Sequence, residues 1–241
     1  ERKDSLNRQL VERMGNQVDA LDRLNIALQE ASRRLMTERE AERKALAREL
    51  HDQIIQDLLS YNYQLEEIEG EIGEDVQREK LAGIRDNIRQ VIGDLRHICS
   101  DLRPPTIDNH GLPVAIRSLA SQWSKACGIP VKLEIDPAFG RLPEPVELSV
   151  FRIVQEGLRN VQKHATATQV TLALERSARA SLIVRLADNG LGMDEPIDLA
   201  ALAEQKHFGL IGISERVSLL NGVLDVKSSP AGGLELDIEI P

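Results

Sequence analysis

The chain is poor in residues that interrupt helices and in residues that build aromatic cores. No proline occurs before Pro104, so no helix in the first hundred residues is interrupted by proline. Aromatic residues make up only 2% of the 241 residues, whereas 41% are hydrophobic. The cores must therefore be built from Leu, Ile, Val and Ala.

Other scarcities exclude whole classes of protein. The two cysteines, Cys99 and Cys127, lack the spacing of a metal site, and a reducing cytosol explains them best. No apolar run approaches the roughly 18 residues that a membrane-spanning helix needs. The net charge of −9 argues against direct binding of nucleic acid.

The sequence begins at Glu1 without a methionine and already inside a helical pattern. We therefore expect a cytoplasmic fragment of a longer protein, with a sensory or membrane part upstream of it. Such a full-length protein could be anchored in the inner (cell) membrane.

Residues from Met14 to Leu35 repeat at the alternating 3-4 spacing of a coiled-coil seam, and the apolar seam continues without a breaker from Leu46 to Ile68. Gln17 is a polar, register-setting position in this seam. No proline or glycine lies between Gly15 and Gly70, so one long helix is predicted to about residue 70. The seam consists of Met14, Gln17, Leu21, Leu24, Leu28, Ala31 and Leu35, followed by Leu46, Leu50, Ile54, Leu58, Tyr61, Leu65 and Ile68.

A second helix follows a turn at 70–75 and ends at Arg103, because Pro104 and Pro105 cannot continue it. Two amphipathic helices cannot bury their apolar faces alone. An antiparallel hairpin that dimerises into a four-helix bundle solves this problem. The apolar face of the second helix consists of Leu81, Ile84, Ile88, Val91, Leu95, Ile98 and Leu102.

The pattern changes after Pro105 to helices that alternate with short strands. This order predicts an α/β sandwich of three helices on a mixed sheet. The fold class is therefore multi-domain, with an all-α part followed by an α+β part. Helices are expected at 111–128, 142–165 and 208–221, and strands at 131–136, 168–175, 181–188, 222–228 and 233–240.

Three short segments of this second part carry candidate chemistry: EGLRNVQKH (156–164), DNGLG (188–192) and GLIGISER (209–216). Glu156 and Asn160 are four apart, so they share a helical face and can offer oxygen ligands to a phosphate-bound Mg²⁺. An Asp followed by two glycines suits a turn where the backbone approaches a flat ring. Glycines at a helix start offer free N–H groups to phosphates. Each segment alone is more often a turn or a packing feature.

The first part carries a second candidate site at His51. A carboxylate beside a histidine, here Asp52, can hold one ring nitrogen as N–H and leave the other as a nucleophile. Alone, such a histidine is more often a solvated surface residue. His51 follows Leu50 of the seam, so its ring is expected at the edge of the buried face, open to solvent. Gln56 lies about one turn further along.

In this order and spacing, the three segments resemble the N box (156–164), G1 box (188–192) and G2 box (209–212) of sensor histidine kinases. Their ATP-binding domain belongs to the superfamily of gyrase, Hsp90 and MutL, known as the GHKL or Bergerat fold. Upstream, ERKALARELHDQIIQDLL (42–59) is similar to the phosphoacceptor helix of the subfamily that pairs with NarL/LuxR-type response regulators. The resemblance covers roughly residues 38 to 241.

The resemblance implies a signalling coiled coil (1–40), a helical hairpin for dimerisation and histidine phosphotransfer (41–105), and an ATP-binding catalytic domain (106–241). The partners implied are a second copy of the chain and a response regulator with a receiver domain. His51 would accept the γ-phosphoryl group of ATP, with Asp52 as its general base. In the pattern Asp-x-x-x-Gln, Gln56 would orient a water against the phosphorylated regulator.

In the nucleotide site, the resemblance assigns Asn160 to Mg²⁺ and Glu156 to a metal-bound water. Lys163 and His164 would face the phosphates, and Asp188 would accept the adenine amino group. Gly190 and Gly192 would let the backbone approach the base. Gly209, Leu210 and Gly212 would form a floor beneath a lid at 194–207, and this lid would include His207.

The chain departs from the family pattern at several positions. Gly157 replaces the usual alanine of the N box, and Ile213 stands where methionine is common. Leu234 follows Gly233 where threonine is usual, so one hydroxyl contact is missing. Two alternatives remain open beside the kinase. One is an ATPase switch of the same superfamily, and the other is a catalytically silent dimerisation scaffold.

Overall fold

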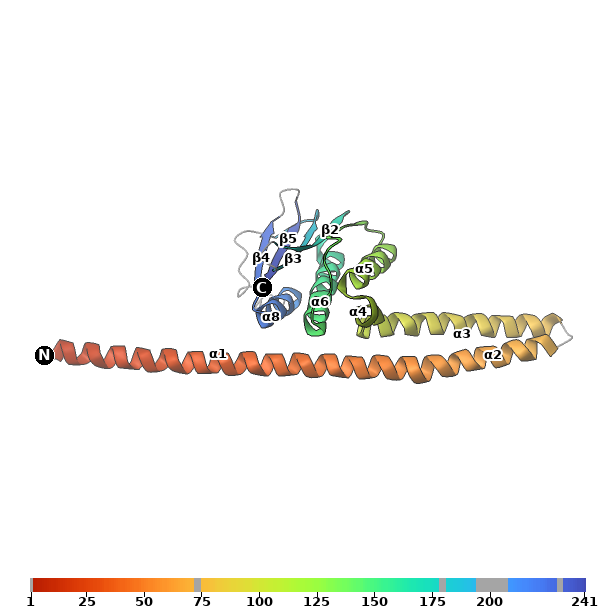
Figure 1. Ribbon diagram of the computed structural model, residues 1–241, viewed down its shortest axis with the longest axis horizontal. Coiled ribbons are helices and arrows are strands. Elements are labelled where there is room, and N and C mark those ends of the chain that lie inside the picture. The colour runs from red at the N-terminus through yellow and green to blue at the C-terminus, as the bar shows by residue number, and fades with distance from the viewer. Residues whose placement is uncertain (1, 72–74, 178–180, 194–207, 229–231) are drawn as a thin grey trace. The chain divides into compact units, whose positions relative to one another are not determined.

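The structure, a computed structural model, describes residues 2–71, 75–177, 181–193, 208–228 and 232–241. The chain divides into two compact units, Glu1–Arg103 and Pro104–Pro241. Figure 1 shows the first unit as helices alone and the second as helices packed on a sheet. The predicted fold class, an all-α part followed by an α/β part, is confirmed.

The described part of the first unit is helical up to Leu102. α1 (Arg2–Glu49) continues into a π-helical segment, η1 (Leu50–Ile55), and then into α2 (Gln56–Glu71). α3 (Asp75–Leu102) ends one residue before the predicted end at Arg103. Its last turn is followed by Pro104, which cannot extend a helix. Residues 72–74, the centre of the predicted turn, lie outside the described residues.

The π-helical segment was not predicted, but its effect is visible in the spacing of buried residues. Ala47, Ile55 and Asn62 are buried on the inner face of the hairpin, at intervals of eight and seven residues. A π-helical turn accommodates one additional residue, and η1 lies within the longer interval. The additional residue therefore keeps the buried positions before and after η1 on one face.

The inner face of α3 is matched to that of α1 and α2. Ile92 and Cys99 are buried seven residues apart, and Ile55 packs with both in one apolar cluster. The Cys99 thiol donates a long hydrogen bond to the Ala47 carbonyl, with Sγ and O 3.7 Å apart. Burial raises the pKa of this thiol. The hairpin is thus held by a narrow apolar seam.

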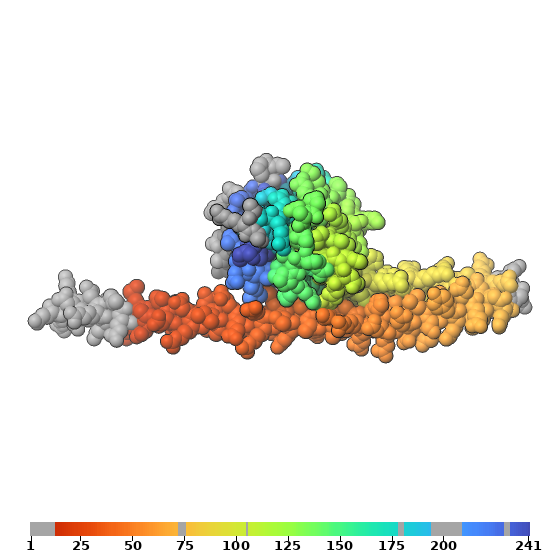
Figure 2. Space-filling view, viewed as in Figure 1, coloured from red at the N-terminus to blue at the C-terminus, as the bar shows by residue number. Residues whose placement is uncertain are grey.

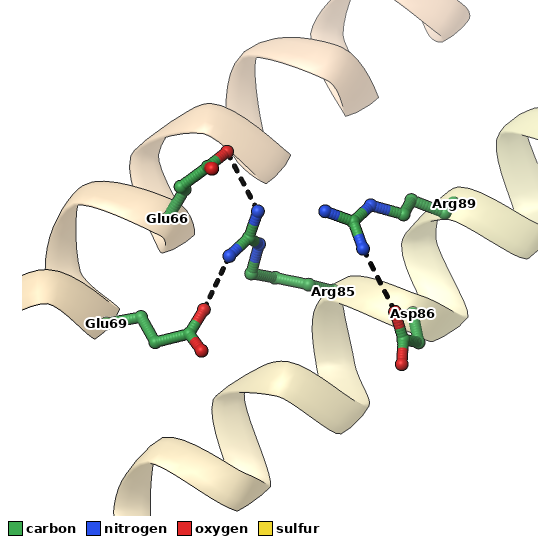
Figure 3. A network of polar contacts seen from close by, with 5 residues as sticks. All are labelled: Glu66, Glu69, Arg85, Asp86 and Arg89. Carbon is green, nitrogen blue, oxygen red and sulfur yellow. Dashed lines mark hydrogen bonds and ion pairs between the residues drawn. The ribbon is translucent and has the colours of Figure 1, made fainter.

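A polar cluster replaces the apolar seam at the end of the hairpin nearest residues 72–74 (Figure 3). Arg85 of α3 is nearly buried and forms ion pairs with Glu66 at 2.8 Å and Glu69 at 2.5 Å, both of α2. The hydrogen bond to Glu69 raises the pKa of the guanidinium, against the opposing effect of desolvation. Arg89 pairs separately with Asp86 on the same helix. Arg85 thus joins α3 to two carboxylates of α2, and a slip of one helix against the other would leave its buried guanidinium unpaired.

A second apolar stripe on the hairpin, which we call the outer stripe, is solvent-exposed in the single chain. Its members are spaced at the same intervals of seven or eight residues as the inner-face positions, and each has at least 42% of its surface exposed. They are Leu46, Ile54, Tyr61 and Ile68 on α1 to α2, and Ile84, Val91 and Ile98 on α3. The predicted single seam is therefore divided between an inner face and this outer stripe. The coiled-coil positions Met14, Leu21, Leu24, Leu28 and Leu35 of α1 are exposed as well.

The second unit consists of a five-stranded sheet and the helices that cover one of its faces (Figure 1). Strand order is β1-β2-β3-β5-β4; β1 and β2 are parallel and the other pairs antiparallel, so the sheet is mixed as predicted. The strands are β1 (Val131–Ile135), β2 (Val170–Arg176), β3 (Leu182–Asp188), β4 (Val223–Ser228) and β5 (Leu234–Ile240). The helices are α4 (Pro105–His110), α5 (Leu112–Cys127), α6 (Glu144–Asn160) and α8 (Phe208–Leu219), with a π-helical segment η2 (Val161–Ala165).

The core of this unit lies between the sheet and α6, which is packed between α5 and α8. Val184 of β3 faces the helices and is flanked by Leu174 of β2 and Ile238 of β5. The opposite sheet face is charged, for example where Arg185 lies 3.4 Å from Glu235. α4 was not predicted, and the helix predicted at 142–165 is divided into α6 and η2.

Among the helices of the described residues, none has a stretch that is both long and apolar enough to cross a bilayer.

Candidate functional site

The centre of the candidate site is the carboxyl end of α6. This helix buries one side against the sheet through residues such as Val154 and Leu158, and the adjacent side carries Glu156 and Asn160. Asn160 is the last α-helical residue, and the chain continues as the π-helix η2. The Asn160 Nδ2 is buried without a hydrogen-bond partner among the described residues. The amide nitrogen is therefore not committed to a structural hydrogen bond within the described residues.

Gly209, at the start of α8, lies directly against this part of α6. A Cβ at position 209 would overlap the Asn160 amide and would lie 2.9 Å from Glu156 Oε1. Glycine therefore lets α8 approach without displacing either of these two side chains. The structure thus brings the predicted residues Glu156, Asn160 and Gly209 together from two distant segments.

The DNGLG segment forms a tight turn at the end of β3. Asp188 is buried, and its Oδ1 accepts a hydrogen bond from the Gly190 N–H at 2.8 Å. The Leu191 N–H donates to the Ala165 carbonyl at 2.9 Å, which ties the turn to η2. A Cβ at Gly190 would collide with that same carbonyl. Gly190 is therefore required for packing of the turn and does not itself line the cavity described below.

Two further residues hold this turn, and sequence reasoning did not assign them to the site. Asn189 Oδ1 accepts hydrogen bonds from the N–H groups of Thr168 and Gln169, both at 2.9 Å. Gly233 has a φ of +90°, and a Cβ there would collide with the Asp188 carbonyl. The sequence does show a Gly-Gly pair before the last strand, which indicates a close backbone contact at Gly233. It does not reveal that the residue contacted is Asp188.

These elements enclose a cavity of about 770 Å³, a size typical of sites for small molecules and cofactors. Of the described residues predicted for the nucleotide site, all but Gly190 and Gly212 line this cavity. Arg159 lines it and was not predicted. Its remaining walls are largely apolar. The lining includes Glu156, Gly157, Arg159, Asn160, Lys163, His164, Leu186, Asp188, Gly192, Met193, Gly209, Leu210, Leu234 and Leu236. The predicted lid at 194–207, with His207, lies outside the described residues.

The second candidate site lies on the first unit, in the π-helical segment η1. His51 Nδ1 and Asp52 Oδ1 are 3.0 Å apart, and both side chains are exposed, at 55% and 74%. The contact joins adjacent residues, whose side chains in a regular α-helix point about 100° apart. π-Helical turns are found frequently at functional sites. Gln56, the first residue of α2, is exposed beside a shallow surface depression lined also by Tyr63 and Glu67.

Comparison with known proteins assigns both regions. Residues 42–107 match the family described as histidine kinase, and residues 146–241 match the family of histidine kinase-, DNA gyrase B- and HSP90-like ATPases. The first match contains the His51 segment, and the second contains every residue that lines the cavity.

Relatives and a solved structure agree with these matches. The chain is 32% identical over 207 residues to the signal transduction histidine-protein kinase/phosphatase DegS of Brevibacillus brevis, covering 84% of this chain and 52% of that protein. It is 31% identical over 202 residues to the oxygen sensor histidine kinase NreB of Staphylococcus carnosus, covering 84% and 57%. The chain thus spans about half the length of these relatives.

The fold resembles that of the histidine kinase domain from the Erythrobacter litoralis EL346 blue-light activated histidine kinase. The TM-score is 0.51 at 20% identity, covering 77% of this chain and 94% of that one. With both family regions present, in the order of the phosphoacceptor helix and then the ATPase fold, the chain belongs to the histidine kinases of two-component signal transduction.

Proposed function

We propose that this chain is the catalytic core of a homodimeric sensor kinase that phosphorylates His51 from Mg-ATP. It then passes the phosphoryl group to an aspartate of a NarL/LuxR-type response regulator. The observation that carries the proposal is the exposed His51–Asp52 pair, 3.0 Å apart, in a chain that also has a nucleotide-sized cavity. Phosphoryl transfer needs chiefly positioning and charge, which these two features supply.

The geometry of the pair defines the role of each ring nitrogen of His51. With Nδ1 donating its proton to Asp52, Nε2 retains its lone pair and faces solvent. That lone pair forms the N–P bond to the γ-phosphorus while the bond to the bridging oxygen breaks and ADP leaves. Asp52 stabilises the positive charge that develops on the ring and, as the general base, takes the Nδ1 proton so that the phosphorylated ring becomes neutral.

The cavity supports adenine binding at one end. Asp188 is buried at the end of β3, and its carboxylate keeps one oxygen for an external donor after accepting the Gly190 N–H. The adenine amino group is such a donor, and guanine lacks one there. Apolar residues nearby, among them Leu186 and Met193, suit a flat ring.

Asn160 and Glu156 are the residues that would hold Mg²⁺. Among the residues that the structure describes, no group of three or more His, Cys, Asp or Glu could hold a metal ion. This fits Mg²⁺, which usually binds through substrate phosphates, waters and only one or two protein oxygens. Asn160 lines the cavity and can supply one amide oxygen, and Glu156 can hold a metal-bound water. Lys163 and His164 line the same cavity and would bind phosphate oxygens.

The outer stripe supports dimerisation with a second copy of the chain. Seven large apolar residues on two adjacent helices are exposed at matching intervals, and an antiparallel hairpin buries such a face by forming a four-helix bundle. The apolar coiled-coil positions of α1 are also exposed in the single chain, and they too would be buried by a partner helix.

A charge in the outer stripe should therefore disrupt the dimer. Val91→Glu places a carboxylate where apolar surface would be buried, and we expect a shift from dimer to monomer at micromolar concentration in sedimentation velocity. Arg96→Glu, at an exposed position of α3 outside the stripe, should remain dimeric. A fully dimeric Val91→Glu variant would show that the bundle does not form through this stripe.

We further propose that Gln56 supports dephosphorylation of the regulator. Its amide is neutral and exposed, at the beginning of the helix that follows His51 and Asp52. A neutral amide can hold a water in line with an aspartyl phosphate without competing as a nucleophile. The relative DegS is named as a kinase/phosphatase, which supports this second activity.

Gln56→Ala should leave phosphorylation of His51 nearly intact and slow dephosphorylation of the regulator by about tenfold or more, the typical effect of losing one positioned catalytic group. The measurement is the decay of phosphorylated regulator in the presence of ADP. Gln90→Ala, an exposed glutamine of α3, serves as the matched control. Equal decay rates for both variants would return Gln56 to the status of a solvated surface residue.

Incubation with γ-labelled ATP and Mg²⁺ tests the proposed function as a whole. A histidine kinase retains label that is stable to base and labile to acid. An ATPase switch releases phosphate and retains no label, and a silent scaffold does neither. Absence of retained label on the dimeric chain would overturn the kinase assignment.

A further inference from the structure

Arg159, on the last turn of α6, lines the nucleotide-sized cavity but was not assigned any role by the sequence motifs. Its side chain is exposed, and it makes no hydrogen bond or ion pair with any described residue. Glu156, three residues earlier, is at the spacing where an Arg–carboxylate pair ordinarily forms. No such pair is present among the described contacts, so both groups remain available to a ligand.

The position of Arg159 on the helix places it among the residues proposed to hold Mg²⁺ and phosphate. Glu156, Arg159, Asn160 and Lys163 lie on consecutive turns of α6 and η2, and all four line the cavity. From Glu156 to Lys163 the helix advances about 10 Å. This wall of the cavity therefore has both the length and the charge to follow an extended polyphosphate chain.

Charge balance at the cavity favours a further cation. A nucleoside triphosphate carries more negative charge than one divalent ion neutralises, and the cavity itself includes two carboxylates, Glu156 and Asp188. Lys163 alone offers only one permanent positive charge against these groups. A guanidinium remains charged at every relevant pH, and its fork of N–H donors matches two phosphate oxygens at once.

We propose that Arg159 binds the terminal phosphates of the nucleotide, as a second permanent cation beside Lys163. The inference rests on the proposed function, since it takes ATP as the occupant of the cavity. The contribution of Arg159 to the binding free energy should grow with the number of phosphates on the nucleotide. It should not depend on recognition of the adenine ring by Asp188.

Calorimetric titration with three probes tests this inference: AMP, ADP and the β,γ-imido analogue of ATP, each with MgCl₂. We expect Arg159→Gln to weaken the imido analogue by about tenfold or more, the usual effect of losing a charge-assisted hydrogen bond. ADP should be weakened less, and AMP should be unchanged. Arg159→Lys, which keeps the charge and loses the fork, should recover part of the affinity. Arg117→Gln, an exposed arginine of α5 outside the cavity, is the matched control.

Different outcomes overturn different statements. Equal affinity of Arg159→Gln and the unsubstituted chain for the imido analogue would make Arg159 a solvated residue at a helix end, where a cation is favoured in any case. Equal weakening for all three probes would indicate a structural role and would overturn the inference as well. If the unsubstituted chain binds none of the probes, the proposed function fails and the inference fails with it.

Discussion

His51→Gln should reduce incorporation of label from γ-labelled ATP to background. Glutamine fits an exposed helical position and keeps a polar side chain, but its amide nitrogen has no available lone pair to attack phosphorus. The substitution lies in the first unit, whereas every residue that lines the cavity lies in the second. Affinity for ATP should therefore be nearly unchanged. The measurement is retained acid-labile label together with calorimetric ATP binding.

His97→Gln is the matched control, because His97 is an exposed histidine on the other helix of the same hairpin. It should be labelled like the unsubstituted chain. Retained label in His51→Gln, mapped to any other histidine, would contradict the assignment of the phosphoacceptor.

Asn160→Asp should reduce phosphorylation of His51 by about 100-fold or more, since even residues outside a metal's direct ligands commonly account for about 10- to 100-fold. The added carboxylate would lie beside Glu156 in the cavity wall and would repel phosphate oxygens. Aspartate has nearly the same shape as asparagine, and the replaced Nδ2 has no hydrogen-bond partner among the described residues. The fold should therefore persist, as measured by circular dichroism.

Gln162→Glu provides the same change from amide to carboxylate two residues further on. Gln162 is exposed and does not line the cavity, so this variant should retain activity. Full activity of Asn160→Asp, or of the unsubstituted chain in excess EDTA, would overturn the assignment of Asn160 to Mg²⁺.

The secondary structure was largely predictable because it follows from local periodicity. The 3-4 spacing of apolar residues predicts the two long helices, and Pro104 terminates the second one. Alternating patterns likewise predicted the five strands to within two residues at each end. Both patterns depend on near neighbours in the chain, which the sequence displays directly.

The π-helical segment η1 was partly readable and was missed. Leu46 and Ile54 of the predicted seam are eight residues apart, whereas Ile54, Tyr61 and Ile68 are separated by seven. The additional residue is the signal of a π-helical turn. The sequence could not show that the turn brings the ring of His51 to the carboxylate of Asp52, because that contact depends on local backbone geometry.

By itself, the sequence determined the order of helices and strands, the family and the residue types available for chemistry, because each depends on local pattern or on short motifs. Only the tertiary structure decided how the cavity is assembled. It placed Gly209 against Asn160, Gly233 against Asp188, and Arg159 in the cavity wall. The physical reason is that these neighbours are set by strand order and by the packing of α6 and α8, which join segments far apart in the chain.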